Sequence, residues 1–133
     1  MPTDIRGLAP LLEVLDMPAS VHFYCDVLGF QVVSTSQPGD HFGWALLALN
    51  GVQLMLNTVY EDGARPPVAA HADTTLFFGC PALYGAYRHL RAHGFNVEEP
   101  VTRHYGMRQL SVMDPDGYNL CFQWPANQTA APS

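Results

Sequence analysis

The residues of this sequence that could carry out covalent chemistry are few and scattered. Three cysteines, Cys25, Cys80 and Cys121, lack CxxC spacing, which disfavours a disulfide framework or a zinc knuckle and fits a reducing cytoplasm. Asp26 follows Cys25, and its charge should raise rather than lower the pKa of that thiol. The sequence contains no GxSxG, GxGxxG or P-loop motif. These patterns disfavour a nucleophilic enzyme and a nucleotide-binding site.

The elements that would position any site are arranged as a weak internal repeat. Residues 11–32 (LLEVLDMPASVHFYCDVLGFQV) match residues 76–97 (LFFGCPALYGAYRHLRAHGFNV) at an offset of 65. Asn50-Gly51 and Asp116-Gly117, at an offset of 66, are both typical of two-residue hairpins between strands. Two equal halves of this kind suggest a duplication.

Each half predicts a helix followed by a strand. Asp16 can cap the first helix, and Gly29 and Gly94 can end the two helices in the left-handed conformation. The segments FQVVSTS (30–36) and FNVEE (95–99) are then predicted strands. The apolar stripes that should face the core are Met17, Val21, Tyr24 and Leu28 in the first helix and Leu83, Ala86 and Leu90 in the second.

The predicted organisation is one compact domain of two βαβββ modules. The modules span residues 1–57 and 74–124, joined by a linker over 58–73 that is rich in Gly, Pro and Ala, and residues 125–133 are a flexible tail.

Composition excludes several classes of function. The chain of 133 residues is 48% hydrophobic and 14% charged, so it should fold around a core. Its net charge is −6, with six arginines and no lysine, which disfavours nucleic-acid and anionic-membrane partners. No apolar run is long enough to cross a membrane, and the first residues do not resemble a signal peptide, so a cytoplasmic protein is expected.

Three segments resemble the vicinal oxygen chelate superfamily, which includes glyoxalase I, bleomycin-resistance proteins and extradiol dioxygenases. They are DMPASVHFYCDVLGF (16–30), AYRHLRAHGF (86–95) and DPDGYNLCFQ (114–123), and the resemblance extends over residues 8–125. It implies an α+β fold in which two βαβββ modules form a curled mixed sheet around a cup, usually in a homodimer. The fold hosts enzymes and plain binding proteins, so it does not by itself specify the function.

The resemblance also implies where metal ligands would stand, and this sequence lacks them. The family places His, Glu or Gln at positions that correspond to Ala9, Met55 (or Gln53), Thr74 or Thr75, and Cys121. Ala9 cannot ligate, a neutral Thr hydroxyl is a poor ligand on its own, and a cysteine within LCF more often packs as a small hydrophobic residue than binds a metal. A metal site would need Glu13, Cys121, Gln123 or a loop histidine such as His71 or His104 to take over ligation. We therefore predict no metal and no cofactor.

Without a metal, the cup would be an apolar cavity suited to a planar ligand. Strand alternation and the segments HFGW and HYGM supply its walls, with Trp124 and Tyr60 at the rim and Gln109 as a further polar group. The predicted ligand-binding residues are Glu13, Phe42, Trp44, Met55, Asn57, Phe77, Tyr105, Met107, Cys121, Gln123 and Trp124.

Three functions follow from these observations. The leading hypothesis is a metal-free, dimeric binding protein that sequesters a bulky, partly aromatic compound such as an antibiotic, with no catalytic residue. The alternative is a divalent-metal-dependent lyase or dioxygenase resembling glyoxalase I. A third possibility is an accessory subunit or regulator that uses the cup only as a dimer surface.

Overall fold

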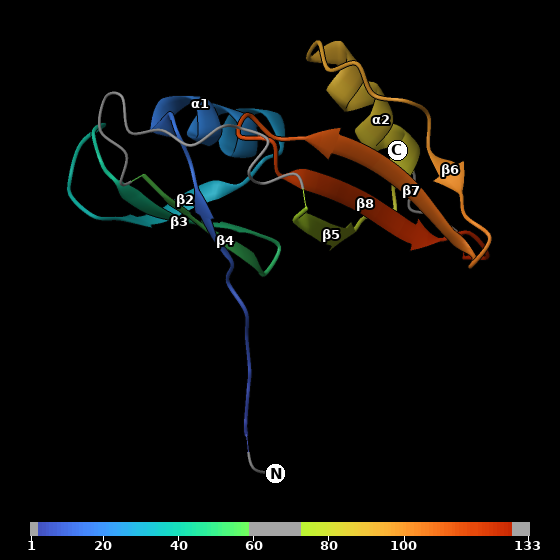
Figure 1. The fold of residues 1–133 in the computed structure, drawn as a ribbon, viewed down its shortest axis with the longest axis horizontal. Coiled ribbons are helices and arrows are strands. Elements are labelled where there is room, and N and C mark those ends of the chain that lie inside the picture. The colour runs from blue at the N-terminus through green and yellow to red at the C-terminus, as the bar shows by residue number, and fades with distance from the viewer. Residues whose placement is uncertain (1–2, 59–72, 129–133) are drawn as a thin grey trace. The chain divides into compact units, whose positions relative to one another are not determined.

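The computed structural model describes residues 3–58 and 73–128. Contacts between residues divide the chain into two compact units, Met1–Arg65 and Pro66–Ser133. In each unit, a four-stranded sheet carries a helix on one face (Figure 1). The predicted linker lies almost entirely outside the described residues, together with Tyr60, His71 and the end of the predicted tail.

The first unit contains sheet A, with strand order β1-β4-β3-β2. Strand β1 runs parallel to β4, and the other neighbours are antiparallel. Its elements are β1 (Leu11–Glu13), α1 (Met17–Val21), the π-helix η1 (His22–Val27), β2 (Gln31–Thr35), β3 (Trp44–Leu49) and β4 (Val52–Asn57).

The second unit repeats this plan in sheet B, with strand order β5-β8-β7-β6 and β5 parallel to β8. The prediction of an α+β fold built from two βαβββ modules is thereby confirmed. Its elements are β5 (Thr75–Gly79), α2 (Leu83–Ala92), β6 (Val101–Thr102), β7 (Met107–Met113) and β8 (Asn119–Pro125). Pro125, predicted to begin the tail, is the last residue of β8.

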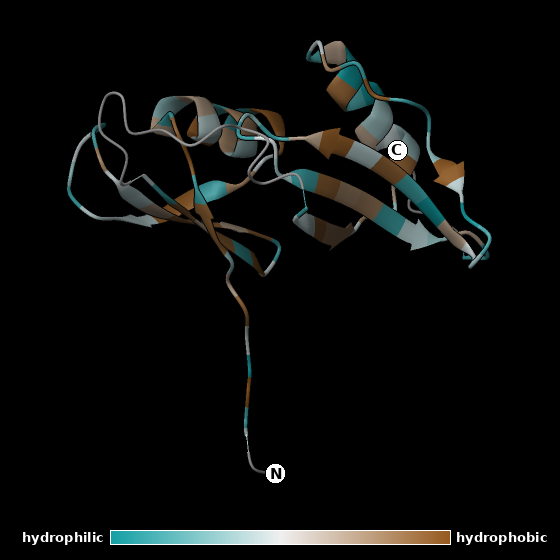
Figure 2. Cartoon of the chain, in the orientation of Figure 1, coloured by the Kyte–Doolittle hydropathy of each residue, from teal (hydrophilic) through white to brown (hydrophobic). Residues whose placement is uncertain are grey.

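Side chains alternate along the strands between an apolar inner face of each sheet and the opposite face. We call this opposite face the open face; it carries Met55 in sheet A and Cys121 in sheet B. In sheet A, the inner residues Leu12, Leu47 and Leu56 are almost completely buried. In sheet B, Leu110 and Leu120 are the corresponding residues, and banding of hydropathy is visible along β7 and β8 (Figure 2). Burial of this apolar area is the main stabilising term of each unit.

The first helix begins as predicted and then widens. The Oδ1 atom of Asp16 accepts the backbone N–H of Ala19 at 3.2 Å. From His22 onward the turns are of the π type, as in the bond from the Leu28 N–H to the Phe23 carbonyl at 3.0 Å. Because a π turn displaces the following side chains around the axis, the predicted stripe is only partly right. Met17 and Tyr24 are buried, Val21 and Leu28 are half-buried, and the other buried residues are Ser20, Phe23 and Val27.

The second half departs from the prediction between the helix and the hairpin. Residues 95–99 were expected to form a strand, but the strand β6 covers only Val101–Thr102 and pairs with Gln109 and Arg108. Pro100 immediately precedes β6 and lacks the N–H that a hydrogen bond to β7 would need, which accounts for the shortened strand.

The two hairpins also differ from each other. Asn50 (φ 52°) and Gly51 (φ 83°) form the predicted two-residue turn. At the second hairpin, Asp114 and Tyr118 instead flank a three-residue loop that ends in Gly117 (φ 88°). The Asp114 N–H donates to the Tyr118 carbonyl at 3.0 Å and the Gly117 N–H to the Asp114 carbonyl at 3.1 Å, which is a type I turn followed by a left-handed glycine. The prediction of a two-residue turn here was wrong.

No helix within residues 3–58 and 73–128 combines the length and apolar character that crossing a membrane requires.

Candidate functional site

The open face of sheet A brings together four of the predicted residues. Strand register places Glu13 beside Asn57 and Asn57 beside Trp44, while Met55 lies between Leu11 and Leu46 in the next row. The Nδ2 atom of Asn57 lies 3.5 Å from the Oε2 atom of Glu13, a long hydrogen bond. All four predicted side chains are half-buried. The face therefore combines an indole, a thioether and a carboxylate–amide pair.

Phe42 lies just before β3, outside the strand register, and is half-buried. The next residue, Gly43, is held by two hydrogen bonds: its N–H donates to the Ser36 Oγ at 3.2 Å, and its carbonyl accepts the Thr58 N–H at 2.7 Å. The backbone that carries Phe42 is thus fixed to the residues that directly follow β2 and β4.

The open face of sheet B brings together Phe77, Met107, Cys121 and Gln123. Register pairs Phe77 with Cys121 across β5 and β8, and Gln123 with Gln109 across β8 and β7. The ring of Phe77 is 58% exposed, whereas Cys121 is buried. The apolar surface on this face is therefore available to a ligand around Phe77.

Two of the predicted ligand-binding residues, Trp124 and Tyr105, do not belong to the groups on the two open faces. Trp124 alternates with Gln123 and lies opposite Arg108, on the inner side of sheet B with Phe122. Tyr105 lies in the loop before β7, is 58% exposed and packs edge-on against His104 at 5.0 Å. We therefore leave Trp124 out of the site proposed below.

The site also includes Arg103 and Ser111, which the sequence analysis did not single out. The Arg103 Nε donates to the Gln109 Oε1 at 3.2 Å, and the Gln109 Nε2 donates to the Gln123 Oε1 at 2.9 Å. Ser111 lies opposite Cys121 in the strand register, and its hydroxyl lowers the pKa of the Cys121 thiol. The glycine of HYGM was the available signal, because a turn at Gly106 folds Arg103 back onto β7.

All three thiols have pKa values above the ordinary value for cysteine. Burial raises the pKa of Cys25, and the charge of Asp26 raises it further, as predicted. Burial also raises the pKa of Cys80 and of Cys121, partly offset at Cys121 by the Ser111 hydrogen bond and the Arg103 charge. The thiolate, which is the nucleophile and the metal ligand, is thus disfavoured at neutral pH.

We accordingly expect all three cysteines to react slowly with 5,5′-dithiobis(2-nitrobenzoate) at pH 8. A raised pKa lowers the thiolate fraction at that pH below that of free cysteine, and burial restricts access. The absorbance of released thionitrobenzoate measures the rate, and the urea-unfolded chain is the control in which three thiols should react rapidly. One thiol that reacts as fast as free cysteine in the folded protein would contradict this interpretation.

The side chains present do not suit a divalent metal. Met55 and Thr75 carry neither imidazole nor carboxylate, Cys121 is a protonated thiol, and Ala9 has no donor atom. The register-shifted candidate, Gln53, is exposed next to the hairpin of sheet A. Within the described ranges, no group of three His, Cys, Asp or Glu residues is placed to hold a metal ion.

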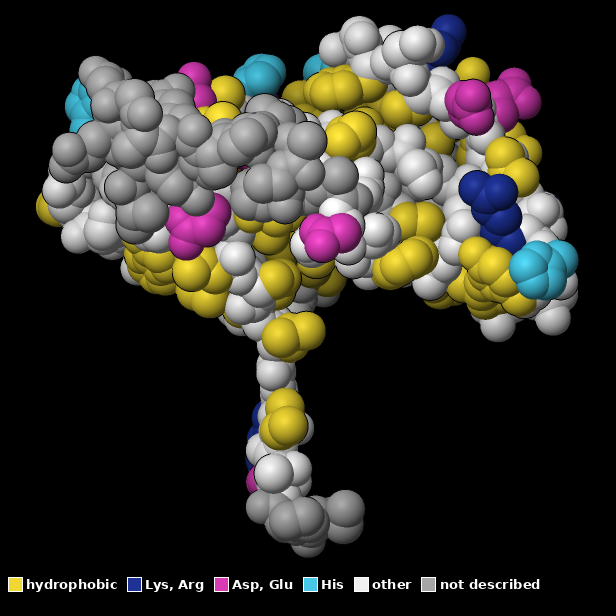
Figure 3. Space-filling model, in the orientation of Figure 1, with side chains coloured by type: hydrophobic (Ala, Val, Ile, Leu, Met, Phe, Trp, Pro, Cys, Tyr) yellow, Lys and Arg dark blue, Asp and Glu magenta, His cyan; other side chains and the backbone are white. Residues whose placement is uncertain are grey.

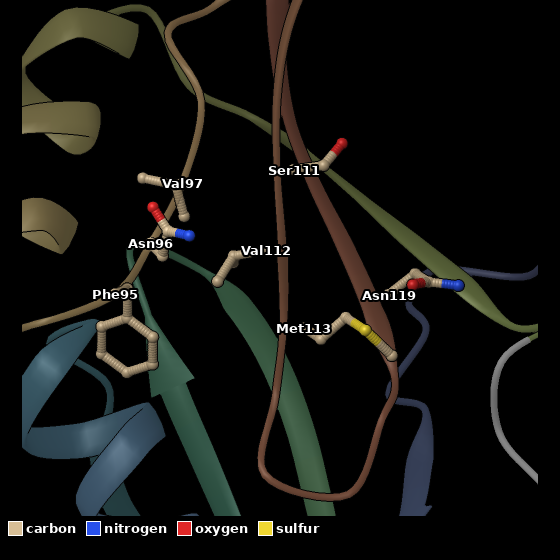
Figure 4. Close-up of a pocket in the computed structure, with 7 residues that line it drawn as sticks. All are labelled: Phe95, Asn96, Val97, Ser111, Val112, Met113 and Asn119. Atoms are coloured by element: carbon tan, nitrogen blue, oxygen red, sulfur yellow. The ribbon is translucent and has the colours of Figure 1, made fainter. Parts of the chain in front are cut away.

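A hollow of about 390 Å³, which shares Ser111 with the open face of sheet B, lies in the second unit between residues 95–97 and strand β7 (Figure 4). It occupies the place where the expected strand 95–99 would have paired with β7. Its lining comprises Phe95, Asn96, Val97, Ser111, Val112, Met113 and Asn119, none of which is a predicted ligand-binding residue.

Comparisons with known proteins agree with this architecture. The family model described as the Glyoxalase/Bleomycin resistance protein/Dioxygenase superfamily matches residues 10–122. No curated protein matches the sequence.

Three solved structures illustrate the similarity. A glyoxalase/bleomycin resistance protein/dioxygenase from Nocardioides is 20% identical, with a TM-score of 0.72 over 98% of this chain and 91% of its own. A bleomycin-binding protein complexed with bleomycin is 20% identical, with a TM-score of 0.68 over 90% of this chain and 98% of its own. An antibiotic-binding protein from Streptomyces sp. CB03234 is 24% identical, with a TM-score of 0.66 over 92% and 99%. At these identities the structures show a shared fold.

Proposed function

Because the chain belongs to the glyoxalase/bleomycin resistance protein/dioxygenase superfamily, we propose that it is a metal-free binding protein for a bulky, partly aromatic small molecule such as an antibiotic. It would protect by stoichiometric capture of the compound, without chemical conversion. The structural relatives that bind bleomycin or another antibiotic support this class of ligand.

The observation that carries the proposal is the composition of the two open faces. At the positions where the resemblance implies metal ligands, this chain has Ala9, Met55 (or Gln53), Thr74 or Thr75, and Cys121. Trp44 and Phe77 on the same faces supply ring surfaces for stacking, and Asn57 and Gln123 supply hydrogen-bonding groups. These groups suit a planar apolar ligand and do not suit a divalent cation.

We expect the purified protein to bind a planar aromatic compound equally well with and without a chelator. Isothermal titration with bleomycin and with N-phenyl-1-naphthylamine, in the presence and absence of EDTA, measures this. Mass spectrometry of the recovered compound should show no chemical change. Binding that is lost in EDTA, or a converted product, would instead favour the alternative of a glyoxalase-like lyase or dioxygenase.

We also propose that the protein is a homodimer. The N-terminal segment before β1 exposes the apolar side chains Ile5 (80%) and Leu8 (85%), and hydrophobic groups are visible along this segment in Figure 3. Large exposed apolar side chains are unfavourable in water and are typical of a surface that another chain covers. A second copy of this chain is the partner that the proposal requires.

Light scattering on a size-exclusion column is expected to give twice the chain mass of 14.6 kDa. The double variant Ile5→Glu/Leu8→Glu should elute as a monomer if these side chains lie in the interface, because it would place two charges there. The matched double variant Val32→Glu/Val33→Glu on the edge strand β2 is the control and should remain dimeric. A monomeric wild-type protein at micromolar concentration would refute the dimer.

A further inference from the structure

A row of polar side chains crosses the open face of sheet B and is tied together by hydrogen bonds. It begins at Arg103, just after β6, continues through Gln109 on β7 and ends at Gln123 on β8. The two bonds measure 3.2 Å and 2.9 Å, and Gln109 in the middle is only 9% exposed. Its amide is therefore held by its two neighbours rather than by water.

The chemistry of Arg103 imposes a direction on this row. A guanidinium donates hydrogen bonds and cannot accept them, so the oxygen of the Gln109 amide must face Arg103. The amide nitrogen of Gln109 then faces Gln123 and donates to its oxygen. Rotating either amide by 180° would bring two donors or two acceptors together. The amide nitrogen of Gln123 is therefore the free end of the row.

Both ends of the row therefore carry hydrogen-bond donors, namely the guanidinium of Arg103 and the amide nitrogen of Gln123. Of the described residues, none accepts a hydrogen bond from either Nη group of Arg103 or from the Nε2 atom of Gln123. Arg103 is exposed and forms no ion pair within the described part of the chain. The thiol of Cys121 is near enough to this row for the charge of Arg103 to lower its pKa, and it is buried.

We propose that the open face of sheet B selects ligands that carry an anionic hydrogen-bond acceptor, such as a carboxylate or a sulfonate, next to their aromatic part. This inference rests on the proposed function, because it specifies the ligand of the same site. The anion binds the guanidinium of Arg103 at one end of the row, a second acceptor of the ligand can bind the amide of Gln123 at the other end, and the apolar part covers Phe77. A cationic group at this place would meet a guanidinium and leave the donors unpaired.

Two fluorescent probes with the same ring system test the selectivity. 8-Anilinonaphthalene-1-sulfonate carries a sulfonate that N-phenyl-1-naphthylamine lacks. Fluorescence titration of the wild-type protein should show about tenfold or greater preference for the sulfonate, as expected for a charge-assisted hydrogen bond. The variant Arg103→Met should lose that preference and keep its affinity for the neutral probe.

Arg108→Met is the matched control. Arg108 is the residue of β7 before Gln109, lies on the opposite face of the sheet, and donates to the Thr102 Oγ1 at 3.2 Å. The substitution removes the same charge from the opposite face of the sheet, so it should leave the preference for the sulfonate intact. Loss of the preference in both arginine variants would show that net charge, rather than the row, determines selectivity and would overturn the proposal.

A second variant reverses the direction of the hydrogen bond between residues 109 and 123 without removing Arg103. In Gln109→Glu, the carboxylate accepts from both Arg103 and Gln123, which neutralises the guanidinium and turns the Gln123 oxygen outward. We expect this variant to lose the preference for the sulfonate as well. The inference would be overturned if the wild-type protein bound the two probes equally well. It would also be overturned if the preference for the sulfonate survived in both Arg103→Met and Gln109→Glu. In either case the proposed function would still stand. Failure of both probes to bind would contradict the proposed function itself.

Discussion

Replacing Asp114 with alanine is expected to lower the free energy of unfolding by about 3 kcal/mol. The Asp114 side chain is 5% exposed, and its Oδ1 atom accepts the backbone N–H groups of Asp116 at 2.8 Å and Tyr118 at 2.9 Å. Both donors lie in a buried turn, so the alanine variant would leave them without this acceptor. Because small domains are stable by only about 5–15 kcal/mol, this loss should be large enough to lower the midpoint of urea unfolding clearly.

Two comparisons separate the contributions to this effect. Asp114→Asn removes the charge and retains an oxygen that can accept both N–H groups, so it should cost much less than alanine. Asp16→Ala removes an exposed helix cap with a single bond to Ala19 and should cost about 1 kcal/mol. If Asp114→Ala proves no more harmful than Asp16→Ala, the turn does not depend on these bonds.

Replacing Trp44 with alanine is expected to weaken binding of N-phenyl-1-naphthylamine about thirtyfold. Trp44 is the large aromatic side chain on the open face of sheet A, beside Asn57, and buried indoles in binding sites typically contribute 2 kcal/mol or more. Isothermal titration measures the loss of affinity without relying on tryptophan fluorescence. The titration is carried out well below the unfolding temperature of the variant.

Tyr84→Ala provides the aromatic control. Tyr84 is 42% exposed on α2, outside both open faces, so its removal should leave affinity unchanged. Unaltered affinity in Trp44→Ala would place the ligand away from the open face of sheet A and would remove half of the proposed site.

The repeat in the sequence was sufficient to predict the plan of both modules. Apolar alternation placed the strands, Asp16 marked the start of the first helix, and Gly29 and Gly94 marked the helix ends with φ values of 96° and 88°. These features depend on neighbours close in the chain, which is why they can be read from the sequence. The same alternation correctly placed Glu13, Met55, Phe77 and Cys121 on faces opposite the helices.

The prediction failed where the two halves differ by a residue or two. In the second half a three-residue loop replaces the two-residue turn, and the segment before Pro100 does not pair with β7. Trp124 lies one residue beyond Gln123, and a shift of one residue in a strand moves a side chain to the other face. The π turns after His22 displaced the helix stripe in a similar way.

The sequence by itself determined the fold class and the family resemblance, and it predicted that the expected ligand positions hold Ala9, Met55 or Gln53, Thr74 or Thr75, and Cys121. Only the tertiary structure placed Arg103 and Gln109 in one row with Gln123. The physical reason is that this row joins three separate segments through cross-strand register, and register depends on loop lengths and pairing across the sheet. Residue types and spacing along one strand do not specify which side chain lies opposite, so the direction of the hydrogen bonds emerged only once the strands were paired.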